Sequence, residues 1–140
     1  METSILSLEV SPIISIENSP IILSGRLIPE MPNENVTLYA KINSATWTVI
    51  GSAATQQDGS FEYVWTTADA GSHGIRAGWS GNEMYTGAMS SARNATVLPI
   101  FLTVLIGVAV IAAIIGVVAI LVAKHGQQEH PEPPLEPQYW

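Results

Sequence analysis

Residues 100–123 read IFLTVLIGVAVIAAIIGVVAILVA, and they separate two parts of the chain with different chemistry. Thr103 is the only polar side chain in this stretch, and no charged residue occurs from Pro99 to Ala123. As a helix rising about 1.5 Å per residue, the stretch is about 36 Å long, more than the bilayer's hydrocarbon core of about 30 Å. It therefore predicts one membrane-spanning helix. We expect a folded domain over residues 1–97, the membrane segment over 98–123 and a tail over 124–140.

The flanks of this stretch bear on its orientation. Pro99 suits a first helical turn, where its missing N–H costs nothing. Lys124 and His125 end the apolar run, and basic residues favour the cytoplasmic side, although Arg93 near the other end makes the charge bias weak. From the character of the domain we expect a single-pass protein of the cell membrane, with the N-terminal domain outside and the tail in the cytoplasm. The first ten residues lack the features of a signal peptide, so either the span translocates the domain or the chain is part of a longer product.

Small residues recur along the predicted helix in steps of three and four, which places them on one face. Small side chains let helices approach closely in lipid, where packing drives association. We expect this face to contact a partner helix or a second copy. The alternative is that alanine and glycine are simply frequent in membrane helices. The residues concerned are Ala109, Ala112, Gly116, Ala119 and Ala123.

Charge and composition exclude several classes of function. The first 97 residues carry nine acidic and four basic side chains, which leaves a formal net charge of −5. Such a surface repels nucleic acid, whose binding needs clustered Lys and Arg. The chain has no cysteine, so thiol catalysis and Cys-based zinc sites are excluded. The three histidines do not cluster at ligand spacing, and we expect neither a metal nor a cofactor.

The first part of the chain alternates short apolar stretches with turn signals, without helical periodicity. In residues 60–66, Phe61, Tyr63 and Trp65 share one face, opposite Glu62 and Val64. This period of two is typical of an antiparallel sheet with one apolar and one wet face. Asp58-Gly59 predicts a tight hairpin between two of the strands. The expected strands are 5–10, 13–16, 21–27, 36–42, 46–51, 60–66, 73–80 and 88–98, an arrangement that favours an all-β sandwich.

Three linked runs carry a family resemblance: SGRLIP at 24–29, NVTLYAKINSATWTVIG at 35–51 and QQDGSFEYVWTTADAGSHGIRAGWSGNEMYTGA at 56–88. Their pattern resembles that of prokaryotic immunoglobulin-like domains of bacterial and archaeal cell surfaces, over about residues 7–97. The resemblance implies an Ig-like antiparallel β-sandwich without disulfides, acting as a spacer, adhesion or ligand-binding module. His73 departs from the pattern, because family members usually carry an aromatic or β-branched residue there.

The aromatic side chains are expected to serve mainly as packing. A sugar-binding platform is the alternative, and it needs two or three coplanar rings on a solvent face. Alternation instead turns most rings inward and leaves Tyr39 and Tyr85 as the more exposed ones. The expected core rings are Trp47, Phe61, Tyr63, Trp65 and Trp79.

No catalytic constellation is found in the sequence. Five acidic side chains that could be imagined as acid–base pairs fall at predicted turns, where solvated carboxylates are the default: Glu30, Glu34, Asp58, Asp69 and Glu83. No calcium-binding D-x-D-x-D-G run occurs. We therefore expect a protein that is not an enzyme. Asn35 and Asn94 begin N-x-[S/T] sequons, which are glycan acceptors if the domain faces outward in a cell that glycosylates.

The tail reads KHGQQEHPEPPLEPQYW, and its prolines favour an extended polyproline II chain. Pro134 and Pro137 fit a P-x-x-P recognition pattern, and Tyr139-Trp140 offers an aromatic end that a partner could bury. The alternative is a solvated stub.

Together these features predict a membrane-anchored, non-catalytic cell-surface module of a prokaryote, for adhesion, spacing or protein interaction. Its expected partners are the lipid bilayer and a protein partner or a second copy, but not nucleic acid. One alternative is an accessory subunit of a membrane complex that docks through its helix and tail. Another is a carbohydrate-binding surface receptor.

Overall fold

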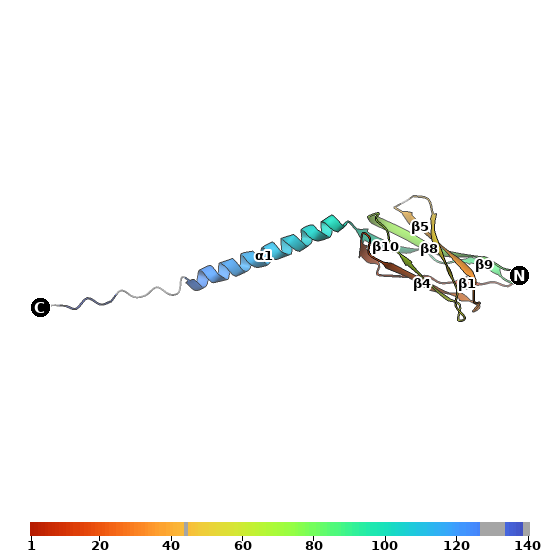
Figure 1. Ribbon diagram of the computed structural model, residues 1–140, viewed down its shortest axis with the longest axis horizontal. Helices are drawn as coiled ribbons and strands as arrows, with labels where there is room; N and C mark the ends of the chain where they lie inside the picture. Colours follow the sequence, from red (N-terminus) through yellow and green to blue (C-terminus); the bar gives the residue numbers. More distant parts are fainter. Residues whose placement is uncertain (44, 127–133, 139–140) are drawn as a thin grey trace. The chain divides into compact units, whose positions relative to one another are not determined.

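The computed structural model describes residues 1–43, 45–126 and 134–138. The chain divides into two compact units, Met1–Thr103 and Val104–Trp140, which are described separately. The first unit is built almost entirely of strands (Figure 1). The elements are β1 (Ile5–Leu6), β2 (Glu9–Ser11), β3 (Ile14–Ile16), β4 (Ile21–Ile28), β5 (Asn35–Ile42), β6 (Thr48–Ala54), β7 (Ser60–Trp65), β8 (Gly71–Gly81), β9 (Thr86–Met89), β10 (Arg93–Leu98) and α1 (Ile100–Gly126).

The smaller sheet is centred on β4, which pairs with β7 along one edge and with β1 and β2 in succession along the other. A single strand was expected over residues 5–10, but the ladder is interrupted at Ser7. The backbone of Ser7 approaches so closely there that a Cβ on Gly25 would lie 2.0 Å from the Ser7 carbonyl oxygen. Only glycine fits at this position of β4.

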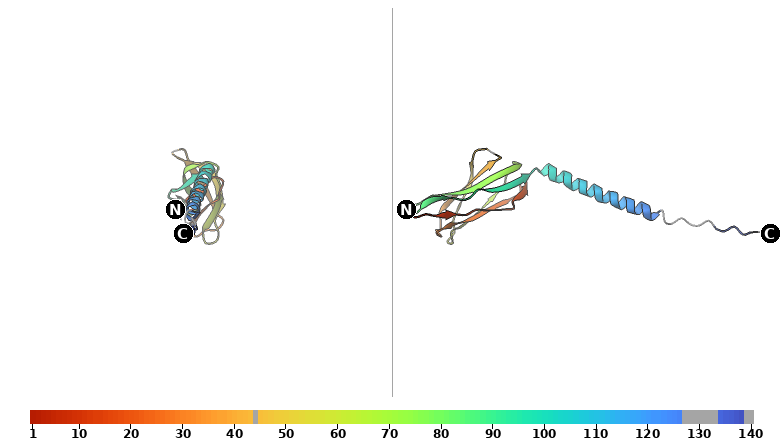
Figure 2. Two further views of the ribbon diagram at one scale, coloured as in Figure 1. Left: turned by 90° about the vertical axis from the view of Figure 1, so that its left-hand side faces the viewer. Right: turned by 180° about the vertical axis from the view of Figure 1, so that it is seen from behind.

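The larger sheet has the order β3-β10-β8-β5-β6, with β9 added to the far end of β8. β8 and β10, green and blue-green in Figure 2, run side by side and antiparallel. The named strands pair antiparallel, as expected, except at one edge, where β3 pairs in parallel with β10. The chain leaves the smaller sheet after β2 and adds β3 to the other sheet, in the same direction as the last strand.

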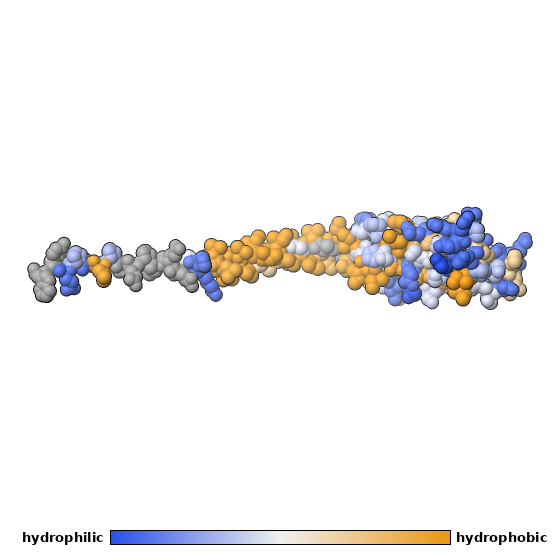
Figure 3. All heavy atoms as spheres, turned by 90° about the horizontal axis from the view of Figure 1, so that it is seen from below, coloured by the Kyte–Doolittle hydropathy of each residue, from blue (hydrophilic) through white to orange (hydrophobic). Residues whose placement is uncertain are grey.

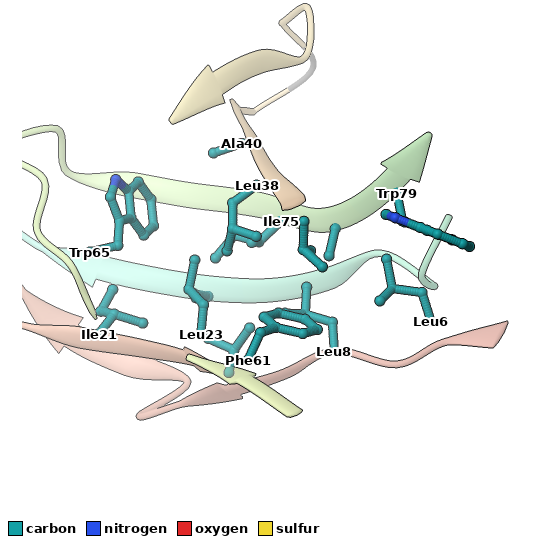
Figure 4. Close-up of a cluster of buried hydrophobic side chains, with 14 of the residues drawn as sticks. Leu6, Leu8, Ile21, Leu23, Leu38, Ala40, Phe61, Trp65, Ile75 and Trp79 are labelled. Carbon is teal, nitrogen blue, oxygen red and sulfur yellow. The ribbon is translucent and has the colours of Figure 1, made fainter. Parts of the chain in front are cut away.

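The core lies between the two sheets. Figure 4 shows Ile21, Leu23 and Phe61 of the smaller sheet directed toward Leu38 and Ile75 of the larger one. All five side chains are buried. Strict alternation along the strands places them there, because successive residues of a strand face opposite sides. The outward-facing positions of both sheets remain available for contacts.

Two other sequence expectations need correction. Asp58-Gly59 does form a tight turn, with Gly59 at a φ of 78° and its N–H donating to the Gln56 carbonyl oxygen at 2.9 Å. The flanking strands do not pair as a hairpin, however, because β6 pairs with β5 and β7 pairs with β4 in the other sheet. The strand expected over 88–98 is divided into β9 and β10 around Ser90, whose hydroxyl accepts a hydrogen bond from the Ala77 N–H at 2.8 Å.

α1 includes the whole apolar stretch and continues to Gly126. It has 27 residues, and the mean hydropathy of its 18-residue window is 3.2, which makes it, within the described part of the chain, the one helix long and apolar enough to cross a membrane. Its surface is mostly apolar (Figure 3). Lys124 and His125 occupy its last turn.

Candidate interaction surface

The outer face of the larger sheet brings together aromatic and basic side chains from three segments. Tyr39 and Lys41 point outward from β5, and Arg76 points outward from β8 directly opposite Tyr39. Trp47, in the segment just before β6, completes the group. We call these four residues, Tyr39, Lys41, Trp47 and Arg76, the basic-aromatic face.

Both basic groups lie on the ring of Trp47. The Arg76 guanidinium carbon is 4.3 Å from the ring centroid and the Lys41 Nζ is 4.7 Å from it. The guanidinium carbon is also 5.7 Å from the centroid of the Tyr39 ring. Such cation–π contacts contribute about 0.5–1 kcal/mol each at exposed sites. The prediction that Trp47 is a core residue is therefore wrong: its ring is half-buried on the outside of the sheet.

Glycine on β8 makes room for this arrangement. A Cβ placed on Gly74 would lie 3.3 Å from both the Lys41 side chain and the Trp47 ring. One on Gly78 would lie 3.1 Å from the Tyr39 ring and 3.2 Å from Met89. The neighbouring side chains thus occupy the space over the two glycines that a β-carbon would need.

Charge is distributed unevenly over the domain. Arg26 pairs with Asp58 at 3.4 Å, and Arg93 pairs with Glu9 at 3.3 Å. Within residues 1–43, 45–126 and 134–138, the other two bases of the domain, Lys41 and Arg76, form no ion pair. In the same range the buried Arg76 Nε has no hydrogen-bond partner. Positive charge without a carboxylate partner is therefore concentrated on one face of an acidic domain.

The other rings follow the sequence expectations more closely. Phe61, Trp65 and Trp79 are buried in the core, as predicted. Tyr63 is half-buried and donates its hydroxyl hydrogen to the Ile50 carbonyl oxygen at 3.0 Å. Tyr85, which was expected to be exposed, is half-buried and packs against the core.

A cavity of about 320 Å³ lies beside the basic-aromatic face, lined by Lys41, Trp65, Asp69 and His73 among others. His73 is 1% exposed, and its ring meets the Trp65 ring edge-on at 5.2 Å. Its Nε2 lies 2.7 Å from the backbone oxygen of Asp69, and its Nδ1 has no hydrogen-bond partner among the described residues. The Asp69 contact therefore involves main chain rather than the carboxylate and does not form an acid–base pair. His73 is a packed side chain of the domain interior.

Asp58, one of the acidic residues at turns, has a structural role. Asp58 accepts hydrogen bonds from the Ser60 hydroxyl and the Ser60 N–H, and these bonds, with the nearby Arg26, hold the pKa of the Asp58 carboxyl below its usual value. Across the described ranges, no group of three or more His, Asp or Glu side chains is placed to hold a metal ion.

The remaining predicted site residues stay predictions. Asn35 and Asn94 are exposed, and both face outward from the larger sheet, with Asn94 opposite Gly74. Pro134 and Pro137 are exposed without regular structure, whereas Tyr139 and Trp140 lie outside the described residues. The small residues of α1 are exposed, and their contact with another helix stays a prediction. They are Ala109, Ala112, Gly116, Ala119 and Ala123.

No protein-family model and no curated protein matches the sequence. Among solved structures, the sporulation control protein Spo0M from Bacillus subtilis aligns with a TM-score of 0.46 and 7% identity, over 69% of this chain and 50% of its own. A family 76 glycoside hydrolase from a bovine Bacteroides thetaiotaomicron strain aligns with a TM-score of 0.42 and 12% identity, over 65% of this chain and 19% of its own. The chain thus spans half of the first and about a fifth of the second. Both TM-scores are below 0.5, so neither likeness supports an inference about function.

Proposed function

We propose that this chain is a single-pass membrane protein whose immunoglobulin-like domain lies outside the cell. The domain binds another protein through the basic-aromatic face and catalyses no reaction. The observation that carries the proposal is the cluster of Lys41 and Arg76 on the Trp47 ring, since these two bases have no ion-pair partner in the described part of the domain.

The strand order supports an Ig-like topology. With β1 and β2 taken as one interrupted strand A, the smaller sheet has the order A-B-E, where β4 is B and β7 is E. The larger sheet then has the order G-F-C-C′, formed by β10, β8, β5 and β6. In immunoglobulin domains the A, B and E strands likewise share one sheet, and C, F and G share the other.

The membrane anchor rests on α1. A fully exposed helix with this hydropathy would be strongly unfavourable in water, because burial of apolar surface is worth about 25 cal/mol per Å². Lipid satisfies that surface, and the helix satisfies its own backbone hydrogen bonds. The Lys124 and His125 pair in the last turn supports a cytoplasmic C-terminal end.

The chemistry of the face favours a protein over a sugar. Trp, Tyr and Arg are the residue types that dominate binding energy in protein interfaces. A sugar platform needs an open ring, whereas the Trp47 ring has two cations within 4.7 Å. A protein surface with carboxylates can pair with those cations and cover the ring at the same time.

The proposal is tested with the full-length protein in native membranes. A photo-reactive amino acid replaces Val49, which is 64% exposed and lies opposite Tyr39 on the same face. A matched probe replaces Met84, which is 68% exposed in the turn before β9. Protein adducts are expected from position 49 and not from position 84, and Lys41→Glu or Arg76→Glu should reduce them. Absence of adducts at position 49, or adducts that persist in both charge-reversed variants, would contradict the proposal. Unchanged thermal unfolding of the variants checks that they fold.

A further inference from the structure

The outer face of the smaller sheet has the opposite chemistry. Glu62 and Val64 point outward from β7, and Val64 lies opposite the outward Ile22 of β4. Val64 is 56% exposed and Ile22 is 42% exposed. Glu9 lies on the same face, across Ser24 from Glu62, and pairs with Arg93. Arg26 also points outward from β4 and pairs with Asp58, so the charge that this face offers to a partner is that of Glu62. We call Glu9, Ile22, Glu62 and Val64 the acidic-apolar face.

The two faces are aligned along the domain. The edge-on contact between the Trp65 and His73 rings, at 5.2 Å, links the end of β7 to the start of β8. Glu62 is three residues before Trp65 on β7, and Arg76 is three residues after His73 on β8. Both therefore lie in the same direction from the contact between the two rings. At about 3.3 Å per residue, both lie about 10 Å from it, on opposite outer faces.

We infer that the protein bound by the basic-aromatic face is a second copy of this chain, which presents its acidic-apolar face. This inference rests on the membrane anchoring proposed above. In this pairing Glu62 of one copy meets Arg76 of the next, and Ile22 and Val64 cover the Trp47 ring.

Charge selects this pairing over the symmetric ones. If two basic-aromatic faces met, Lys41 and Arg76 of one copy would face the same bases of the other. If two acidic-apolar faces met, the Glu62 carboxylates of the two copies would face each other. Like charges across an interface suppress such wrong pairings. Because the two complementary surfaces lie on opposite sides of the domain, the contact is heterologous and leaves one free face at each end of a pair, to which a further copy can bind. Repeated, it produces rows of copies along the membrane surface.

The absence of cysteine in the chain permits a clean test. Full-length Val49→Cys and Val64→Cys variants with different tags are co-expressed, and their membranes are treated with a short flexible bismaleimide. A cross-linked product containing both tags is expected, no product is expected from either variant alone, and a ladder is expected from the double variant. Met84→Cys co-expressed with Val49→Cys is the control for random collision and should give no product.

Two results overturn the inference. A Val49→Cys product formed without the second variant shows a symmetric contact, and absence of product in every combination shows that copies do not pair. If position 49 still gives charge-dependent photo-adducts with a different protein, the proposed function stands while this inference fails.

A charge exchange tests the pairing itself. Arg76→Glu alone and Glu62→Arg alone should each lower the yield of the two-tag product by about tenfold. Copies carrying both substitutions should recover it, because the exchanged faces are again complementary. Recovery cannot follow from misfolding. Failure to recover, or full yield in the single variants, overturns the charge pairing.

Discussion

Arg93 on β10 donates a hydrogen bond from its Nε to the carbonyl oxygen of Leu8, at 2.9 Å, and so joins the larger sheet to the first edge of the smaller one. Its Nη2 also pairs with Glu9 at 3.3 Å. Among the described strands, β2 pairs only with β4, and the Arg93 hydrogen bond is made to the residue just before β2.

Replacement of Arg93 should weaken the connection between the two sheets. Arg93→Ala is expected to lower the free energy of unfolding by about 1–2 kcal/mol, because a charged hydrogen bond to main chain is lost at a partly exposed site. Arg93→Lys, which keeps the charge but not the Nε donor, should recover only part of it. Urea unfolding of the detergent-solubilised full chain, followed by tryptophan fluorescence, measures both. Equal stability of Arg93→Ala and the wild type would show that the bond contributes nothing.

Gly25 should not tolerate a side chain. In Gly25→Ala the new Cβ would lie 2.0 Å from the Ser7 carbonyl oxygen and 2.7 Å from the Phe61 ring, so the backbone of β1–β2 must move. We expect a loss of about 3 kcal/mol or more, the upper end of the cost of overpacking. Ser24→Ala, one residue away, is the matched control and should change stability by less than about 1 kcal/mol. A Gly25→Ala protein as stable as that control would contradict the close approach.

The buried Trp79 depends on one acceptor. Its Nε1 donates to the Glu34 Oε2 at 3.0 Å, and the ring is 4% exposed. Glu34→Ala leaves the N–H without this acceptor and should cost about 1–3 kcal/mol. Glu34→Gln retains an oxygen acceptor and should cost clearly less. If both substitutions had the same effect, the hydrogen bond would not be the reason that Glu34 stabilises the domain.

The Asp58 turn should make stability depend on pH in the acid range. Because the hydrogen bonds from Ser60 and the charge of Arg26 lower the pKa of Asp58 in the folded state, the unfolded state binds the proton more readily. The ionised carboxylate therefore contributes stability above its ordinary pKa of 3.8, and this contribution is lost as pH falls through the lower folded value. Relative to Asp58→Asn, the wild type should be more stable at pH 7, with a difference that shrinks as the pH falls below 3.8. Paired unfolding curves across this range measure the difference, and a constant difference would contradict the assignment.

Alternation in the sequence predicts most of the β domain, because a period of two defines which face of a strand is buried. It places Leu38 and Ile75 inside and Tyr39 and Arg76 outside without any knowledge of which strands pair. It does not show that Asp58-Gly59 joins two different sheets, since a tight turn has the same residues whether the flanking strands pair or cross over. The parallel pairing of β3 is likewise a long-range contact without a local signal.

The basic-aromatic face could be found only in part. The outward positions of Tyr39, Lys41 and Arg76 follow from alternation, but their proximity depends on β5 pairing with β8 in one register. The sequence predicts Trp47 wrongly as a core residue, because a tryptophan near a strand is usually part of the core. Its ring instead lies over Gly74, where the missing side chain provides the space. The glycine spacing on β8 is the signal that would have indicated an occupied outer face.

Alkaline carbonate extraction of membranes from cells that express the full chain shows whether α1 resides in lipid. The wild type should remain in the membrane pellet, whereas a variant with Ile111→Lys and Ile115→Lys should appear in the supernatant, because two charges at the helix centre oppose insertion. Release of the wild-type chain into the supernatant would contradict a membrane-anchored protein, and with it the function proposed for its outer domain.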